Sequence, residues 1–271
     1  MSSINGEGAG SAPTRTRPPI AQLLSRHGLI AFAAVLTAVV LAWRWLMASG
    51  MSAMPMDGHA MTSVDPWSLS YLGPAFAMWS VMMVAMMLPS ATPMILLHAR
   101  IDRAPTSARR LAHSLIFACA YLLVWTGFSA MAALAQALLI DLGLLSRISL
   151  AVGSRTLAAA LLVAAALYQL SPAKAACLNQ CRSPIHFVMR YWSSGFAGAL
   201  RLGLAHGLAC VGCCWGLMLL LFVAGVMNLA WVAVLAAIVL AERLAPPNWQ
   251  ASRVIAGLLL AGAVALVATG V

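Results

Sequence analysis

The sequence predicts an all-α protein, a polytopic bundle of about seven transmembrane helices with a cytoplasmic N-terminus, and a six-span bundle is the alternative. The 271 residues are 63% hydrophobic and only 8% charged, whereas about 25% charged residues is usual for a soluble domain. Apolar runs of membrane-spanning length recur along the chain, and its basic residues gather on one side of them. Soluble, disordered and collagen-like proteins are therefore excluded.

Each spanning helix needs about 20 apolar residues, and helices are expected because lipid cannot satisfy the backbone of an open strand. The runs cover residues 28–47, 71–97, 111–140, 156–170, 197–225, 229–240 and 254–271. The fourth and sixth are short, which leaves the six-span alternative open. Residues 1–27 are expected to form a polar, disordered cytoplasmic tail, and residues 28–271 a single helical domain.

The net charge of +10 indicates the orientation of the chain in a membrane. In the seven-span layout all of the 16 basic residues lie on one side except Arg44, Arg147 and Arg155. Basic loops face the cytoplasm, so the N-terminus is expected inside and the C-terminus outside. The first run exceeds the length of a signal-peptide core, so an uncleaved anchor is expected. Nucleic acid is not an expected partner.

The fifth run carries the most specific motif, which consists of His206, Cys210, Cys213 and Cys214. At 100° per residue these side chains share one helix face. Thiolate and imidazole are ligands for Cu(I), zinc or an iron centre, including haem iron. A redox-active thiol pair and plain packing of cysteine as a small apolar residue are the alternatives. Cys119, alone on the third run, is expected in the core.

The second run is rich in methionine, a soft and neutral ligand that holds Cu(I) without releasing a proton. The candidate ligands form two adjacent rows on the helix, Met78, Met82, Met83, Met86 and Met87. Core packing is the alternative. Counting 1.5 Å per residue places Met82–Met87 and Cys210–Cys214 at a similar level near the bilayer midplane.

Two further groups flank the membrane in this layout. The outer loop, residues 48–70, contains Met54, Met56 and His59 and is expected to capture copper, with a loop lacking function as the alternative. The cytoplasmic loop, residues 171–196, contains Cys177 and Cys181, whose i, i+4 spacing suits a soft metal. Without a second pair it does not form a zinc-ribbon pattern.

The remaining polar residues of the runs suggest structural roles. His98 and His113 flank an Arg-rich loop and are expected at a solvated interface, while Glu242 is expected to pair with its neighbour Arg243. The chain has no phosphate-binding P-loop motif and only six acidic residues. ATP hydrolysis and carboxylate-based catalysis are therefore disfavoured.

The sequence resembles a bacterial family of predicted metal-binding integral membrane proteins of unknown function. The resemblance covers roughly residues 65–245. It rests on Met78-Trp79 through Met-Met-x-Ala-Met-Met-Leu-Pro-Ser to Pro93, on Tyr168-Gln169 with Cys177-x3-Cys181 and Pro184, and on His206-Gly207 through Gly212-Cys213-Cys214-Trp215 to Met227-Asn228 and Glu242. It implies metal binding and supplies no reaction.

The leading hypothesis is an inner-membrane protein that handles Cu(I), either transporting it or delivering it to a copper enzyme. Expected partners are the lipid bilayer, a metal ion, and a periplasmic copper protein or membrane copper enzyme. The oligomeric state is left open. The alternatives are a membrane thiol–disulfide enzyme that uses Cys210, Cys213 and Cys214, and a non-catalytic subunit of a larger membrane complex. A transporter, metal chaperone or assembly factor is expected over an enzyme.

Overall fold

The structure, a computed structural model, describes residues 26–52, 65–102, 104–245 and 250–268. Every named element in these ranges is a helix, and their only β pairing is an isolated bridge between Leu145 and Val152. The all-α prediction is confirmed. The helices are α2 (Arg26–Ser52), α3 (Leu69–Ile101), α4 (Ser107–Asp141), α5 (Arg155–Gln169), α6 (Pro172–Arg182), α7 (Pro184–Tyr191), α8 (Gly195–Met218), α9 (Leu221–Ala224), α10 (Leu229–Leu244) and α11 (Ala251–Ala268).

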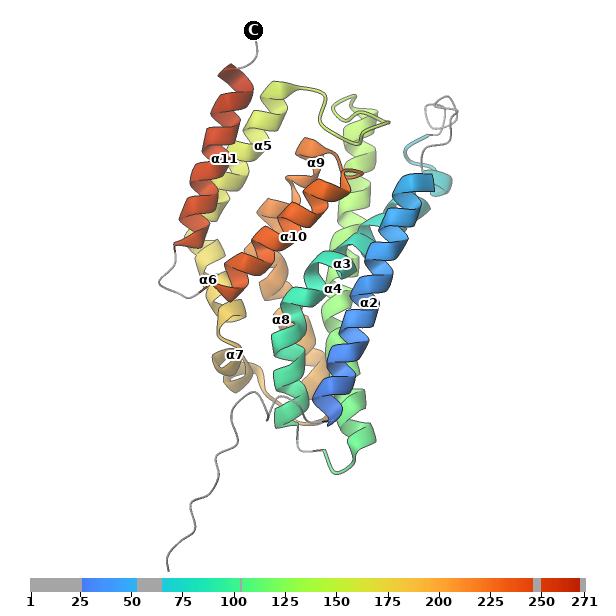
Figure 1. The fold of residues 1–271 in the computed structure, drawn as a ribbon, viewed down its shortest axis with the longest axis vertical. Helices are drawn as coiled ribbons and strands as arrows, with labels where there is room; N and C mark the ends of the chain where they lie inside the picture. The colour runs from blue at the N-terminus through green and yellow to red at the C-terminus, as the bar shows by residue number, and fades with distance from the viewer. Residues whose placement is uncertain (1–25, 53–64, 103, 246–249, 269–271) are drawn as a thin grey trace, which may run out of the picture.

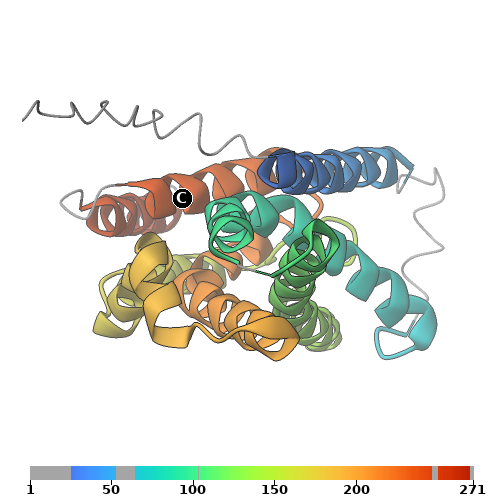
Figure 2. The ribbon, with the colours of Figure 1, turned by 90° about the horizontal axis from the view of Figure 1, so that it is seen from below.

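The helices form an elongated bundle in which α2, α3, α4 and α8 pack in sequence and α5 pairs with α11 (Figure 1). Seen from below, α3 lies between α2 and α10 on one side and α4 on the other (Figure 2). We call the end that holds α7 and the α3–α4 junction the basal end, and the opposite end, near α9, the apical end. The start of α2 and the end of α11 lie at opposite ends (Figure 1).

Five stretches among the described residues are long and apolar enough to cross a membrane, and a bent sixth is formed by α5 and α6 together. The five are α2, α3, α4, α8 with α9, and α11. The difference from seven arises because α10 has 16 residues, about 24 Å of helix against a bilayer core of about 30 Å. The seven-span count, the tail and the placement of the termini stay predictions.

The break between α5 and α6 determines the position of the Cys-x3-Cys segment in the bundle. Ser171 caps α6 by accepting a hydrogen bond from the Lys174 backbone N–H, and Pro172 occupies the first turn, where a missing N–H has no cost. The two helix axes differ by 63°. Residues 172–182 are therefore an ordered helix that is tipped against α8.

Helix α3 carries Pro74, Pro89 and Pro93 in its interior and changes direction partway along the bundle (Figure 1). Proline removes a backbone donor and displaces the preceding turn. Pro89 and Pro93 leave the carbonyls of Ala85 and Pro89 without their usual helical donors. Nearby hydroxyls also bond the backbone here, since Ser90 donates to Met87 O at 2.7 Å and Thr92 to Leu88 O at 3.1 Å. The distortion therefore begins in the last turn of the methionine-rich stretch of α3.

Helices α4 and α8 approach to backbone contact through glycine. A Cβ on Gly203 would collide with the Phe117 carbonyl, and one on Gly207 would lie 2.9 Å from Val124. The absence of a side chain at these two positions is therefore what permits the close packing of α4 on α8.

Cys119 is exposed on α4, which corrects the expectation that it belongs to the core. The physical reason is helical phase. The α4 face formed by Phe117, Ala120 and Tyr121 is the one buried in the bundle, and residue 119 projects away from it.

We expect Gly203→Ala to lower the free energy of unfolding by roughly 1–3 kcal/mol, because the added methyl group meets a backbone carbonyl that cannot rotate away. Gly127→Ala on α4 is the matched control, since a Cβ there meets nothing within 4 Å. It should leave stability unchanged or raise it by up to about 1 kcal/mol. Unfolding by SDS in mixed micelles gives both values, and equal midpoints for the two variants would contradict the contact.

Candidate metal centre

The cysteines of α6 and α8 gather into one group. Cys210, Cys213 and Cys214 are buried, and the last two thiols donate to the Cys210 carbonyl at 3.1 and 3.0 Å. Cys181 Sγ lies 3.9 Å from Cys213 Sγ, and Cys177 Sγ lies against Gly212. From the sequence, the cysteines of α6 and those of α8 are expected to form two separate metal-binding groups. The structure places them side by side, and we call them the thiol cluster.

The thiol cluster lies beside the methionine rows. Met82, Met83, Met86 and Met87 are buried and Met78 is half-buried. Tyr121 of α4 donates its hydroxyl to Met87 O at 3.1 Å and lies 3.0 Å from Cys210 Sγ. Since that hydroxyl has one hydrogen, the Cys210 thiol is the donor in the second bond. Met87 and Cys210 thus share one neighbour, and the depth of the two groups in a membrane stays a prediction.

Arg243 points into the thiol cluster, and the expected pair with Glu242 is wrong. Its Nη2 donates to Cys213 Sγ at 3.3 Å and its Nη1 to Ser90 Oγ at 3.1 Å. Adjacent helical residues project about 100° apart, so Glu242 faces another neighbour. Its carboxylate pairs with Lys174 Nζ at 2.7 Å, with side chains 1% and 2% exposed.

The Lys174–Glu242 pair is the centre of a polar network that joins α6, α10 and α11. Arg182 donates Nε and Nη2 to the Glu242 carbonyl at 2.9 and 2.7 Å, and Ser252 donates to Glu242 Oε1. Just before the break that precedes α6, Tyr168 of α5 donates to the Gly212 carbonyl of α8. These bonds hold α6 in the position that brings its cysteines to α8.

His206 lies among aromatic rings and not with the cysteines. Both ring nitrogens lack a partner, and the rings of Phe187, Tyr121 and Phe117 have centroids 5.4, 5.6 and 6.0 Å away. Among the residues that the structure describes, no three His, Cys, Asp or Glu side chains are close enough to hold a metal ion. His206 and Cys214 in particular are about 12 Å apart along the helix axis, too far to bind one ion together.

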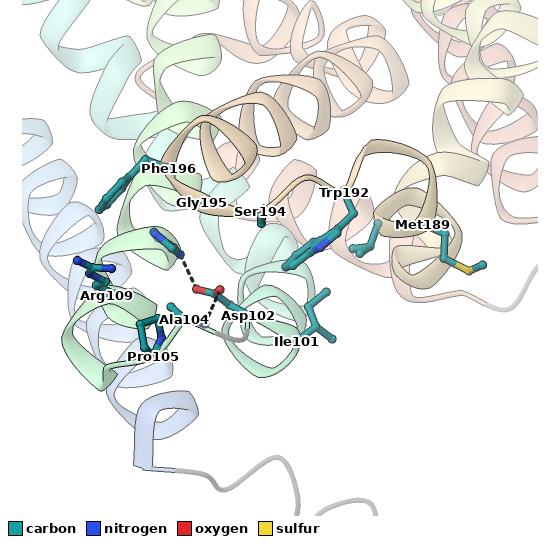
Figure 3. Close-up of a pocket in the computed structure, with 12 residues that line it drawn as sticks. Ile101, Asp102, Ala104, Pro105, Arg109, Met189, Trp192, Ser194, Gly195 and Phe196 are labelled. Carbon is teal, nitrogen blue, oxygen red and sulfur yellow. Dashed lines mark hydrogen bonds and ion pairs between the residues drawn. The ribbon is translucent and has the colours of Figure 1, made fainter.

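His98 and His113 are buried near the basal end, which corrects the expected solvated position. His113 Nδ1 lies 2.7 Å from Asp102 Oδ2, and the His98 ring stacks on Phe117. His113 and Asp102 border a cavity of about 950 Å³, which is also lined by Arg109, Trp192 and Phe196 (Figure 3). Trp192, at the end of α7, lies against His98, and Phe196 of α8 lies against His113. These residues are far away in the chain, so the sequence around the two histidines does not indicate their burial.

A second cavity, of about 500 Å³, opens toward the apical end between α2, α3 and α4. Met78, Met82 and Met227 line it. Gln136 also borders it, and this amide accepts from Trp79 at 2.8 Å and donates to the Tyr71 hydroxyl at 2.7 Å. Met54, Met56 and His59, the predicted outer ligands, lie outside the described residues.

Sequence reasoning missed four residues of the site: Ser90, Tyr121, Met227 and Arg243. None stands in a ligand-spacing motif of its own. Tyr121 and Arg243 have one available signal, since a Tyr and an Arg within or beside apolar runs need polar partners. The identity of those partners depends on interhelical contacts.

Long apolar helices around buried thiols and thioethers define a helical protein suited to handling soft metal ions. A family model for PpoB2, described as a copper chaperone, matches residues 76–266. This is well over half of the chain, so the chain belongs to the PpoB2 copper chaperone family. The resemblance to a metal-binding bacterial family is consistent with this match. No curated protein and no solved structure matched the chain.

We expect Lys174→Met to lower the free energy of unfolding by about 3–5 kcal/mol, because it leaves the Glu242 carboxylate buried without a counter-charge. The double variant Lys174→Met/Glu242→Gln removes both charges and should recover part of that loss. Arg109→Gln, an exposed change at the basal cavity, is the control and should stay within about 0.5 kcal/mol of the wild type. A double variant no more stable than Lys174→Met in SDS unfolding would refute the pairing.

Proposed function

We propose that this protein is an inner-membrane copper chaperone that accepts Cu(I), holds it at the thiol cluster and delivers it to a copper protein. Copper is its cargo. The observation that carries the proposal is the approach of Cys181 and Cys213, two thiols from different helices with sulfurs 3.9 Å apart. Membership of a copper chaperone family supports the choice of metal.

The spacing of these thiols suits an ion held between them. Metal–thiolate bonds of about 2.3 Å allow two ligating sulfurs to be up to roughly 4.6 Å apart. Zinc in structural sites takes four ligands, and the described residues offer no group of three His, Cys, Asp or Glu side chains. A soft ion that needs few ligands, such as Cu(I), is therefore favoured over zinc. Cys210, Cys214 and Cys177 would be exchange ligands, with His206 one turn nearer the basal end.

The thioethers would form the entry route. Met78, Met82 and Met227 surround the apical cavity, and Met83, Met86 and Met87 continue toward Tyr121 and the thiol cluster. Neutral sulfur binds Cu(I) without proton release, whereas the thiols beyond it gain affinity by losing protons. Met54, Met56 and His59 would capture the ion outside, in the orientation that the positive-inside rule gives.

Delivery is favoured over transport by the exposure of the cysteines. Cys210, Cys213 and Cys214 are buried, while Cys177 and Cys181 on α6 are half-buried. A partner copper protein or membrane copper enzyme can thus take the ion directly from the protein by ligand exchange at α6, without release of the free ion. Buried thiols that hold tightly suit a chaperone better than a fast transporter.

A thiol–disulfide enzyme is the second candidate, and the same contact favours it. The pair would be Cys181 with Cys213, from two helices, and not the set within α8 named from the sequence, since Cys213 and Cys214 both donate to the Cys210 carbonyl. Such an enzyme would form a disulfide in turnover with an oxidant. A chaperone would keep both thiols reduced while loaded with copper.

We expect the purified protein from copper-supplemented cells to carry about one Cu(I) per chain, and Cys181→Ser/Cys213→Ser less than about 0.1, because hydroxyl oxygen is a poor ligand for soft ions. Cys119→Ser, an exposed cysteine away from the cluster, is the control and should match the wild type. Metal analysis after gel filtration measures all three. Less than about 0.1 copper per chain in the wild type would refute copper handling, and a copper-loaded double variant would refute this site.

We expect Met82→Leu/Met86→Leu to slow loading by roughly tenfold or more while leaving the final copper content unchanged, since thioethers would serve entry and thiols retention. Leucine preserves the packing volume, so stability should change by less than about 1.5 kcal/mol. Stopped-flow transfer from a Cu(I)–chelator complex measures the rate. An unchanged rate would place the entry route elsewhere.

A further inference from the structure

Arg243 is a buried cation without a carboxylate partner among the described residues. Its guanidinium bonds Ser90 Oγ and Cys213 Sγ, and its Nε has no partner. The adjacent carboxylate, Glu242, is bound to Lys174 on the other side of α10. An uncompensated charge in a low-dielectric interior is strongly unfavourable. Its position therefore calls for a negative charge at the group it touches, which is a thiol.

The other charges near the thiol cluster do not cancel that of Arg243. Lys174 and Glu242 form a neutral pair at 2.7 Å. Arg182 is half-buried and donates to the backbone carbonyl of Glu242, so solvent screens part of its charge. Among the described residues, Arg243 is thus the cation that bonds a thiol of the cluster, and it stays ionised because a guanidinium does not lose its proton in proteins.

We propose that Arg243 makes the Cys181–Cys213 pair a charge-balanced site for one monovalent soft ion and discriminates against divalent ions. This inference rests on the proposed function and adds the selection of the ion. On binding, both thiols release their protons and supply two negative charges. Cu(I) or Ag(I) leaves one negative charge, which Arg243 neutralises. Zn(II) leaves none, so the charge of Arg243 stays uncompensated.

This balance supplies a selectivity that the ligand atoms lack. Thiolate sulfur binds both Cu(I) and Zn(II), and in general selectivity depends on geometry, ligand type and metal supply. A fixed cation in contact with a ligating sulfur adds an electrostatic contribution to the binding free energy, and this contribution depends only on the charge of the metal ion. Since the contact is buried, solvent screens this contribution only weakly.

The test is a competition between Ag(I), a redox-stable monovalent ion, and Zn(II) on the full chain in detergent. We expect Arg243→Gln to shift the ratio of affinities toward Zn(II) by at least about tenfold, because removal of the cation leaves Ag(I) with an uncompensated negative charge and Zn(II) with none. Arg243→Lys retains the charge and should shift the ratio by less than about threefold.

Two matched controls separate charge from structure. Arg201→Gln on α8 and Arg190→Gln on α7 each remove an exposed cation that lies outside the thiol cluster and its supporting network. Both should keep the wild-type ratio. An unchanged ratio in Arg243→Gln, or an equal shift in Arg243→Lys, would overturn the inference. Wild type that binds neither ion would refute the proposed function, whereas selectivity without Arg243 would refute this inference alone.

Should Arg243→Gln fail to fold, Arg243→Lys/Ser90→Ala supplies the measurement. Without the Ser90 hydroxyl, an ammonium at position 243 keeps the charge and loses the forked geometry. Preference for Ag(I) in that variant would support selection by charge. Its loss would show that the hydrogen-bond geometry, and not the charge, is responsible, and would overturn the proposal.

Discussion

The buried ion pair between Lys174 and Glu242 is the interaction on which the site depends. It joins α6 to α10, and its loss would free the helix that carries Cys177 and Cys181. The pair is well formed because Arg182 and Ser252 satisfy further acceptors of Glu242. A buried charge that loses its partner is strongly destabilising, so this ion pair fixes the position of α6. In that position Cys181 of α6 lies next to Cys213 of α8, although the two helices are apart in sequence.

A second constraint is the close approach of α4 to α8 at Gly203 and Gly207. It brings Tyr121 within reach of both Met87 and Cys210. The Tyr121 hydroxyl therefore links the turn of α3 that precedes Pro89 to the turn of α8 that carries the cysteines. Small residues at helix contacts are common where lipid provides no hydrophobic drive for association. The thioethers and thiols are thereby connected without any ligand bridging them.

Prediction from the sequence succeeded where the relevant rule is local. Apolar run length predicted the helices, and the residue count along α3 and α8 is consistent with the contact of Tyr121 with both Met87 and Cys210. It failed where partners come from other helices. Glu242 was expected to pair with the residue beside it, and His98 was expected in solvent, because a single sequence does not show which helix covers a side chain. The missed Arg243 contact has the same origin.

The sequence by itself determined the all-α class, the helical faces that carry Met, Cys and His, and the scarcity of acids that leaves sulfur and imidazole as ligands. These properties follow from composition and a 3.6-residue period, which need no knowledge of neighbours. Only the tertiary structure decided that Cys181 meets Cys213 and that Arg243 faces the thiols. The bend of 63° between α5 and α6 tips Cys181 toward α8, and the packing of α10 beside α8 directs Arg243 to Cys213. Both arrangements depend on contacts between segments far apart in the chain, which a single sequence does not show.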